Sequence, residues 1–341
     1  MIYLNCDYLE GCHPAILEAL TRTNLEQTVG YGMDDYCAQA KDMIRSRFAC
    51  PDSAVHFVVG GTQANTIVIA SALRPYEGAL CAHTGHINVH ETGAIESSGH
   101  KCMAIPAADG KITPEQILAE VALQGDDEHM VRPGMVYISM STELGTVYTL
   151  AELEAIYAAC RKTGLYLFVD GARLGYALAA PQCDITPEDL PRLCDVFTIG
   201  GTKVGALFGE AIVINHPDLM PRFRYMIKQR GGMLAKGRLL GLQFTTLMQD
   251  DLYFRIAEKA VEQAQRIRTA LLDNNIPLLV DSPTNQLFGV FTHAQAAQLA
   301  KDFHLENNGV VDDDHIALRI CTSWATTEEN VAALLSAIAG L

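Results

Sequence analysis

The residues LYLFVDGARLGYAL at positions 165–178 and CDVFTIGGTKVG at positions 194–205 share one pattern. Each stretch contains a short apolar run of the length expected for a buried strand. The first run ends at Asp170, and the second ends in a Gly-Gly-Thr turn that is followed by Lys203. Ligands of open α/β sheets bind outside the carboxyl ends of the strands. The pattern therefore predicts a carboxylate and an amine at one ligand-binding edge.

Pyridoxal phosphate chemistry uses such a pair. Lys203 would form a Schiff base with the cofactor, and Asp170 would keep the pyridine nitrogen protonated. Each residue taken alone is more often structural, as an N-capping Asp or a solvated loop Lys. The rest of the chain must therefore discriminate between the two interpretations.

Composition narrows the class of protein. The length of 341 residues predicts two domains, which we place at 1–250 and 251–341. A net charge of -15 without any Lys/Arg run argues against nucleic acid as a partner. The N-terminus lacks a basic leader region and no uncharged stretch is long enough for a bilayer, so we expect no membrane association. The ten cysteines are scattered singly, which predicts a reducing cytoplasm and no metal site.

Strand and helix signals alternate along the chain, which is typical of a mostly parallel sheet. Capping boxes begin at Thr113 and Thr149 and predict two helix starts. Further apolar runs predict strands at 54–59, 78–83, 135–140 and 211–214. After a long helical region the pattern changes to strands at 278–280 and 287–291, then a helix, a strand at 316–321 and a final helix. This order predicts a smaller α+β domain at the C-terminal end.

A Gly-Gly-Thr turn at 60–62 joins the strand predicted at 54–59 to a helix predicted at 63–73. The free N–H groups and the dipole at a helix start attract anions, so the turn can hold a phosphate. Glycines at a strand–helix corner more often serve backbone geometry alone. The phosphate interpretation gains weight because Asp170 and Lys203 require an anion site.

Five motifs together carry a family resemblance: GGTQAN at 60–65, GHINVHETGA at 85–94, VDGARL at 169–174, FTIGGTK at 197–203 and ALRICTS at 317–323. Over nearly its full length the chain resembles the fold-type-I pyridoxal phosphate enzymes, in the branch of low-specificity L-threonine aldolases and their β-eliminating relatives. The resemblance implies an α/β fold of this type, with a mostly parallel sheet in the large domain and a smaller α+β C-terminal domain.

The resemblance also implies roles for individual residues. Lys203 would be the Schiff-base lysine, Asp170 the partner of the pyridine nitrogen, and His86 the imidazole stacked on the ring. Further cofactor contacts would come from Gly61, Thr62, Arg173 and Thr202. The substrate would be bound by Arg319, Arg173, Tyr31 and Asp7, with the Arg forks matching its carboxylate. Arg319 lies in an apolar strand, where an Arg without an anionic partner is costly.

The implied reaction is retro-aldol cleavage of a β-hydroxy-α-amino acid to glycine and an aldehyde. The implied assembly is a homodimer or homotetramer in which the segment around Tyr31 reaches the partner's cofactor. Two alternatives stay open. One keeps the cofactor but performs β-elimination, transamination or racemisation, and the other is a catalytically idle binding protein of the same fold. Intact Lys203, Asp170 and Arg319 argue against the idle protein.

The chain departs from the aldolase pattern on the substrate side. Glu143, in Ser-Thr-Glu-Leu-Gly at 141–145, stands where the family usually has a His that contacts the substrate hydroxyl. The usual Thr-His after the small-domain Arg is replaced at 322–324 by Thr-Ser-Trp, and the usual N-terminal Ser-Asp-Thr by Cys-Asp-Tyr at 6–8. Glu143 is therefore expected to face the substrate. Its carboxylate would either accept the hydroxyl proton or hold a cationic or hydroxylated substrate side chain, and so select a substrate unlike threonine.

Overall fold

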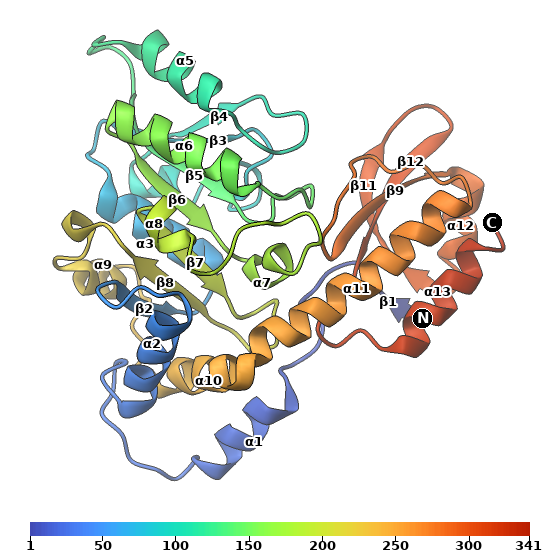
Figure 1. The fold of residues 1–341 in the computed structure, drawn as a ribbon, viewed down its shortest axis with the longest axis horizontal. Coiled ribbons are helices and arrows are strands. Elements are labelled where there is room, and N and C mark those ends of the chain that lie inside the picture. Colours follow the sequence, from blue (N-terminus) through green and yellow to red (C-terminus); the bar gives the residue numbers. More distant parts are fainter.

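The computed structural model describes all 341 residues. A large lobe and a smaller lobe are joined by the long helix α11 (Leu252–Asp273), and both chain termini lie at the smaller lobe (Figure 1). None of the helices combines the length and the apolar character that a bilayer crossing requires.

A seven-stranded sheet forms the centre of the large lobe, in the order β2-β8-β7-β6-β5-β3-β4. The strands are β2 (Ala54–Val58), β3 (Glu77–Ala82), β4 (Cys102–Ile105), β5 (Arg132–Ser139), β6 (Tyr166–Asp170), β7 (Val196–Gly200) and β8 (Glu210–Ile214). Only β8 runs antiparallel to its neighbours. The predicted mostly parallel sheet is therefore confirmed, and the strand predicted at 211–214 lies beside β7.

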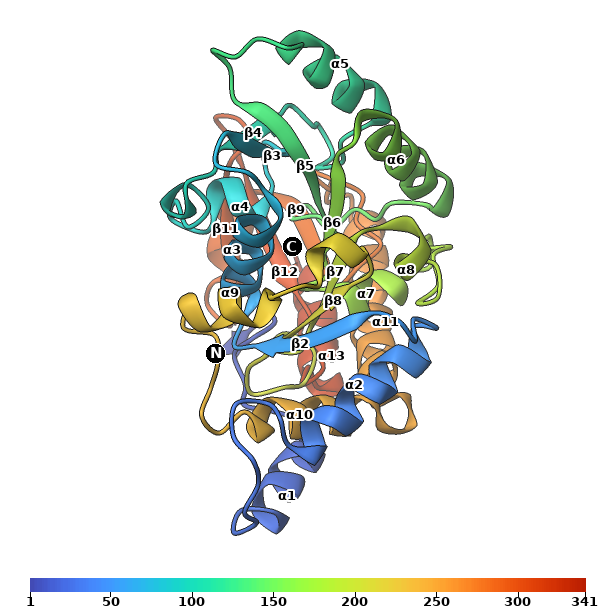
Figure 2. The same cartoon turned by 90° about the vertical axis from the view of Figure 1, so that its left-hand side faces the viewer.

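Both faces of this sheet are covered by helices (Figure 2). On one face lie α3 (Gly61–Ala72), α4 (His86–Val89) and α9 (Phe223–Gln229). The other face carries α1 (Pro14–Arg22), α2 (Asp35–Arg47), α5 (Pro114–Gln124), α6 (Leu150–Thr163), α7 (Leu174–Leu178), α8 (Leu190–Leu193) and α10 (Arg238–Met248). Because strand side chains alternate between faces, a sheet buried on both faces produces the near-continuous apolar runs seen in the sequence.

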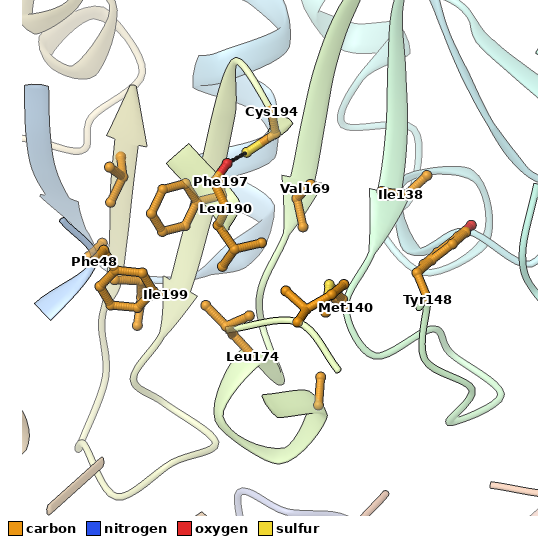
Figure 3. Close-up of a cluster of buried hydrophobic side chains, with 14 of the residues drawn as sticks. Phe48, Ile138, Met140, Tyr148, Val169, Leu174, Leu190, Cys194, Phe197 and Ile199 are labelled. Atoms are coloured by element: carbon orange, nitrogen blue, oxygen red, sulfur yellow. Dashed lines mark hydrogen bonds between the residues drawn. The ribbon is translucent and has the colours of Figure 1, made fainter. Parts of the chain in front are cut away.

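The larger of the two cores lies between the sheet and this second set of helices. Val169, Phe197 and Ile199 point from the strands toward Phe48 and Leu174 (Figure 3). All five side chains are fully buried. This packing fixes β6 and β7, and it therefore fixes the positions at which Asp170 and Lys203 leave the sheet.

The smaller lobe contains a three-stranded antiparallel sheet of β11 (Glu306–Val310), β12 (His315–Cys321) and β9 (Gln286–Thr292). It is completed by α12 (His293–Leu299), α13 (Glu328–Ile338) and the short parallel pair β1 (Ile2–Tyr3) and β10 (Phe303–His304). The strand predicted at 278–280 is wrong, because Leu278 forms only an isolated bridge to Gly289.

The passage from one lobe to the other occurs inside α11. Its first half packs Phe254 and Val261 into the large-lobe core, and its second half packs Ile267 and Leu271 into the small-lobe core. A division of the chain at 250/251 stays a prediction. The capping boxes at Thr113 and Thr149 are both present, as predicted.

Candidate active site

Asp170 is the last residue of β6 and is 4% exposed. Its Oδ2 accepts hydrogen bonds from the Tyr137 hydroxyl at 2.6 Å and from Asn65 Nδ2 at 3.0 Å, and its Oδ1 accepts from the Ala172 N–H at 2.9 Å. Burial and the nearby Asp170 carboxylate raise the pKa of Tyr137, so the phenol remains a donor. Three donors thus hold this carboxylate in one orientation.

A buried polar network connects Asp170 to His86. Asn65 also donates to Glu91 Oε1 at 2.7 Å, and the same oxygen lies 2.8 Å from His86 Nδ1. Asn65 and Glu91 are buried, whereas His86 opens onto the cavity. Sequence reasoning assigned no role to Asn65, Glu91 or Tyr137, although two of them lie in the quoted motifs. A carboxylate that orients an imidazole through one ring nitrogen leaves the other nitrogen facing the site.

Lys203 follows β7 at the same edge of the sheet and is half-buried. Burial lowers the pKa of its amine, and the Arg173 guanidinium lowers it further. No carboxylate oxygen lies within 4.0 Å of the amine. Since only a neutral amine attacks a carbonyl carbon, this environment favours reaction of Lys203 with an aldehyde.

The predicted phosphate cradle lies at the start of α3. Gly60 occupies the N-cap in an extended conformation and makes no side-chain capping bond. Gly61 and Thr62 follow in the first turn, where N–H groups point out of the helix. Arg230 borders the same hollow, held by a 3.1 Å hydrogen bond from Gln63 Nε2 to its carbonyl oxygen. The cradle is thus lined by the first residues of the helix and by Arg230.

Thr202 reaches this region from the turn before Lys203. Its hydroxyl accepts the Gly209 N–H at 3.1 Å and lines the cavity that contains Gly61, Thr62 and Asp170. The cavity has a volume of about 340 Å³. The structure thus brings together all seven predicted cofactor residues: Gly61, Thr62, His86, Asp170, Arg173, Thr202 and Lys203.

Glu143 lies in the segment after β5 and faces this cavity. Its Oε1 accepts hydrogen bonds from the His86 backbone N–H at 2.9 Å and from the Ser139 hydroxyl at 2.6 Å. Burial raises the pKa of Glu143, although the Ser139 hydrogen bond acts in the opposite direction. One oxygen is thus fixed by the protein, while Oε2 accepts no hydrogen bond from the chain and is available to a ligand.

Asp7 and Arg173 form a buried bidentate ion pair. The Nε–Oδ2 distance is 2.7 Å and the Nη2–Oδ1 distance is 3.0 Å, and Asn285 Nδ2 also donates to Asp7 at 2.9 Å. Burial alone would raise the pKa of Asp7, but the guanidinium outweighs it and lowers that pKa. The pair joins the N-terminal segment to the start of α7, and Arg173 still lines the cavity.

Replacing Asp7 with Asn is expected to destabilise the fold by about 3–5 kcal/mol at pH 7, because it leaves the Arg173 charge buried without a counter-ion. The folded-state pKa of Asp7 is depressed, so the contribution of this carboxylate is present above its unfolded pKa and lost as pH falls through the folded value. The difference in free energy of unfolding, measured in urea, should therefore shrink at acid pH.

A matched control is Asp42→Asn, which removes the carboxylate of an exposed ion pair with Arg45. This change should cost at most about 1 kcal/mol. Equal effects of the two substitutions would contradict a structural role for the Asp7–Arg173 pair.

Arg319 projects from β12 into a second cavity of about 700 Å³. Its guanidinium donates to the Asn5 carbonyl at 3.2 and 2.8 Å and has no carboxylate partner in the chain. The two cavities share Tyr8, His86, Glu143, Arg173 and Lys203, so they are parts of one site. The anionic partner that Arg319 lacks is what a substrate carboxylate would supply.

Tyr31 is not brought to the cavity of its own chain. It has a φ of 61°, is 47% exposed and packs under Lys228, whose Nζ lies 4.9 Å from the ring centroid. Its contact with a partner's site stays a prediction. Tyr8, which sequence reasoning left without a role, lines both parts of the site instead.

Pyridoxal phosphate fits these residues on three counts. Lys203 is an amine with a depressed pKa, Asp170 is a carboxylate already oriented by donors, and α3 offers an anion site. Ser141 Oγ and Asn65 Oδ1 line the same cavity, buried and without a partner in the chain. The α/β sheet with this arrangement at its carboxyl edge defines a pyridoxal phosphate enzyme of fold type I.

Comparison with known proteins agrees with this class. The model of the beta-eliminating lyase family matches residues 4–295. The low specificity L-threonine aldolase of a Pseudomonas species is 34% identical over 340 residues, which cover 97% of this chain and 95% of that protein. A threonine aldolase structure from Leishmania major superposes with a TM-score of 0.98 at 43% identity, covering 100% and 99% of the two chains.

A Thermus thermophilus aspartate aminotransferase shares the fold at only 12% identity, with a TM-score of 0.73 and coverage of 100% and 91%. The match over most of the chain and the identity to full-length relatives settle the family. The chain belongs to the beta-eliminating lyase family.

Proposed function

We propose that this protein cleaves a threonine-like β-hydroxy-α-amino acid into glycine and an aldehyde, with pyridoxal phosphate as cofactor. The observation that carries the proposal is that Lys203, Glu143 and Arg319 line one cavity. They supply an amine for the cofactor, a proton acceptor and a carboxylate-binding group. The names of the similar proteins, which are threonine aldolases, support the same reaction.

When bound, pyridoxal phosphate withdraws electrons from the α-carbon of a substrate amino acid. Asp170, held in one orientation by Tyr137 and Asn65, would accept a hydrogen bond from the pyridine N–H. Lys203 would hold the cofactor through its side-chain amine, whose lowered pKa favours reaction with an aldehyde. The N–H groups of Gly61 and Thr62, together with Thr202, would hold the phosphate, and His86 would support the ring.

Arg319 and Arg173 orient the substrate. Arg319, free of any carboxylate in the chain, binds the substrate carboxylate, and Arg173 adds positive charge beside it while Asp7 fixes its orientation. A fixed carboxylate selects which bond to the α-carbon is broken. Glu143 Oε2 then removes the β-hydroxyl proton, while Oε1 stays anchored by Ser139 and His86.

Product analysis tests the reaction. Purified protein incubated with L-threonine, L-allo-threonine and β-phenylserine should release glycine and the matching aldehyde in equal amounts, and Lys203→Ala should release neither. Release of ammonia and a keto acid, or transfer of the amino group, would instead identify one of the other pyridoxal phosphate reactions.

We infer a homodimer or homotetramer with active sites shared between subunits. The loop before α2 exposes Leu25 at 92%, Val29 at 67% and Met33 at 62%, next to Tyr31, and such a cluster is typical of a subunit contact. Light scattering is expected to give two or four times the 37.1 kDa chain mass. A stable monomer with full activity would contradict this assembly.

We also propose a cytoplasmic location. All ten cysteines are free thiols and nine of them are buried, which suits a reducing compartment. Cell fractionation that recovers the protein with an oxidising or membrane compartment would exclude it.

A further inference from the structure

Glu210 is a buried carboxyl group to which the proposed reaction gives no role. It is the first residue of β8, paired with Gly200 on one side and Val58 on the other, and it is 2% exposed. Because β8 runs antiparallel to its neighbours, its first residue lies at the edge where the other strands end. Glu210 therefore sits between the turn that leads to Lys203 and the strand that leads to the phosphate cradle.

Glu210 faces the cavity of about 340 Å³ together with Gly61, Thr62, Asp170 and Lys203. Its Oε1 is buried and has no hydrogen-bond partner in the chain. No Lys or Arg nitrogen lies within 4.0 Å of its carboxyl oxygens. An anionic carboxylate buried without a cation is costly, whereas a neutral carboxyl group needs only ordinary hydrogen bonds.

The charged and titratable groups around Glu210 come from three elements. Asp170 on β6 disfavours a negative charge on Glu210, and Lys203 after β7 favours it. A charge on Glu210 also raises the pKa of Tyr253 on α11. Burial, followed by the Asp170 carboxylate, raises the pKa of Glu210 to about 8, although Lys203 opposes the shift. At neutral pH the side chain is therefore mostly a neutral acid that can donate a hydrogen bond.

The position of the phosphate cradle indicates a ligand for a neutral Glu210 side chain. Glu210 pairs with Val58, only three residues before Gly61. A phosphate ester held there carries close to two negative charges at pH 7 and above. We propose that Glu210 keeps its proton when pyridoxal phosphate binds and acts as a neutral hydrogen-bond donor beside the phosphate, so that loss of this proton weakens cofactor binding. The proposal rests on the cofactor of the proposed function, not on which substrate bond is cleaved.

The direction of the pH effect follows from the sign of the shift. Below the raised pKa Glu210 is neutral and supports the bound phosphate. Above it, the carboxylate is anionic beside both the phosphate and Asp170. Because one proton is then coupled to binding, affinity should fall by about tenfold for each pH unit above the pKa.

The test measures binding instead of activity. Full-length protein is freed of cofactor, and equilibrium dialysis gives the Kd for pyridoxine 5′-phosphate between pH 7 and 9.5. This probe lacks the aldehyde and so forms no covalent bond with Lys203. The wild-type Kd is expected to rise about tenfold per pH unit above pH 8. Glu210→Gln, which keeps the shape and a donor but cannot ionise, should lack this rise.

Two controls isolate the phosphate. Pyridoxine without phosphate should show much smaller differences between wild type and Glu210→Gln across the pH range. Glu210→Ala, which removes the donor, should weaken binding of pyridoxine 5′-phosphate at pH 7 by roughly 10- to 100-fold, the value of a hydrogen bond to a charged group. This second variant keeps the proposal testable if the Gln variant fails to fold.

Parallel pH profiles for wild type and Glu210→Gln would overturn the proposal. So would a large loss of affinity in Glu210→Gln at pH 7, since that result would mean that the negative charge itself is needed. A failure of the wild type to bind pyridoxine 5′-phosphate at any pH would count against the cofactor site as a whole. Normal pH-coupled binding without release of glycine would leave Glu210's role intact and reject only the aldol reaction.

Discussion

Replacing Lys203 with Ala is expected to abolish covalent attachment of pyridoxal phosphate and to reduce substrate cleavage by more than the two to four orders of magnitude, roughly, that a general base contributes. The physical reason is that no other amine combines a lowered pKa with a place beside Asp170 in the same cavity. The absorption band of the covalently attached cofactor should be lost in the variant, which gives a readout independent of turnover.

Borohydride reduction of the loaded wild-type protein, followed by peptide mass mapping, locates the modified residue. The pyridoxyl mass should appear on Lys203. Lys228→Ala and Lys236→Ala are matched controls, because both lysines are exposed and neither lines the cavity that contains Lys203. Each control should retain label on Lys203. Label on Lys228 or Lys236 in the wild type would refute the assignment.

The large-lobe fold could be predicted because its sheet is buried on both faces. Phe168 and Val169 are adjacent in sequence and enter the two different cores, so the strand reads as an uninterrupted apolar run. Burial on both faces also gives β7 and β8 continuous apolar runs that can be recognised in the sequence. Asp170 ends one such run and Lys203 comes one short turn after the other, so strand direction alone brings them to one edge of the sheet.

The strands that could not be predicted from the sequence are short and pair with segments far away in the chain. β1 and β10 contain two residues each and exist because they pair with one another across 300 residues of chain. Leu278 has the apolar neighbours of a strand but makes only one bridge. In such short segments local propensity is overridden by tertiary context.

Part of the site was also hidden for this reason. Asn65 and Glu91 lie on different elements, and only the fold brings both to Asp170 and His86. Their positions within the GGTQAN and GHINVHETGA motifs were the available signal. Glu210 had no such signal, since an acidic residue at the start of a strand usually faces solvent.

Glu143→Gln is expected to lower retro-aldol cleavage by about two to four orders of magnitude while the absorption of the bound cofactor stays unchanged. Gln preserves the size of the side chain, and its amide oxygen can still accept the hydrogen bonds from His86 and Ser139. Gln lacks the second carboxylate oxygen, Oε2, which is the proposed proton acceptor. Binding of substrate, followed through the change in cofactor spectrum, should therefore weaken far less than turnover.

A control comes from the other side of the cavity. Glu306 lines the same space from β11 but is exposed, and it has none of the buried contacts of Glu143. Glu306→Gln should change cleavage by a few-fold at most, because an exposed carboxylate is well solvated. Equal losses in the two variants would mean that negative charge in the cavity, not a proton acceptor, supports the reaction.

The pH profile separates a base from a merely polar residue. A general base works in its ionised form, and the pKa of Glu143 is raised by burial. Wild-type kcat should therefore fall as pH decreases through that raised pKa, whereas the residual rate of Glu143→Gln should lack this acid limb. Asp170 and Lys203 are intact in both proteins. Any fall in kcat that is caused by their titration would therefore appear in the pH profiles of both wild type and Glu143→Gln. If the acid limb persists unchanged in Glu143→Gln, the β-hydroxyl proton leaves through another group, and the neighbouring His86 becomes the acceptor to test.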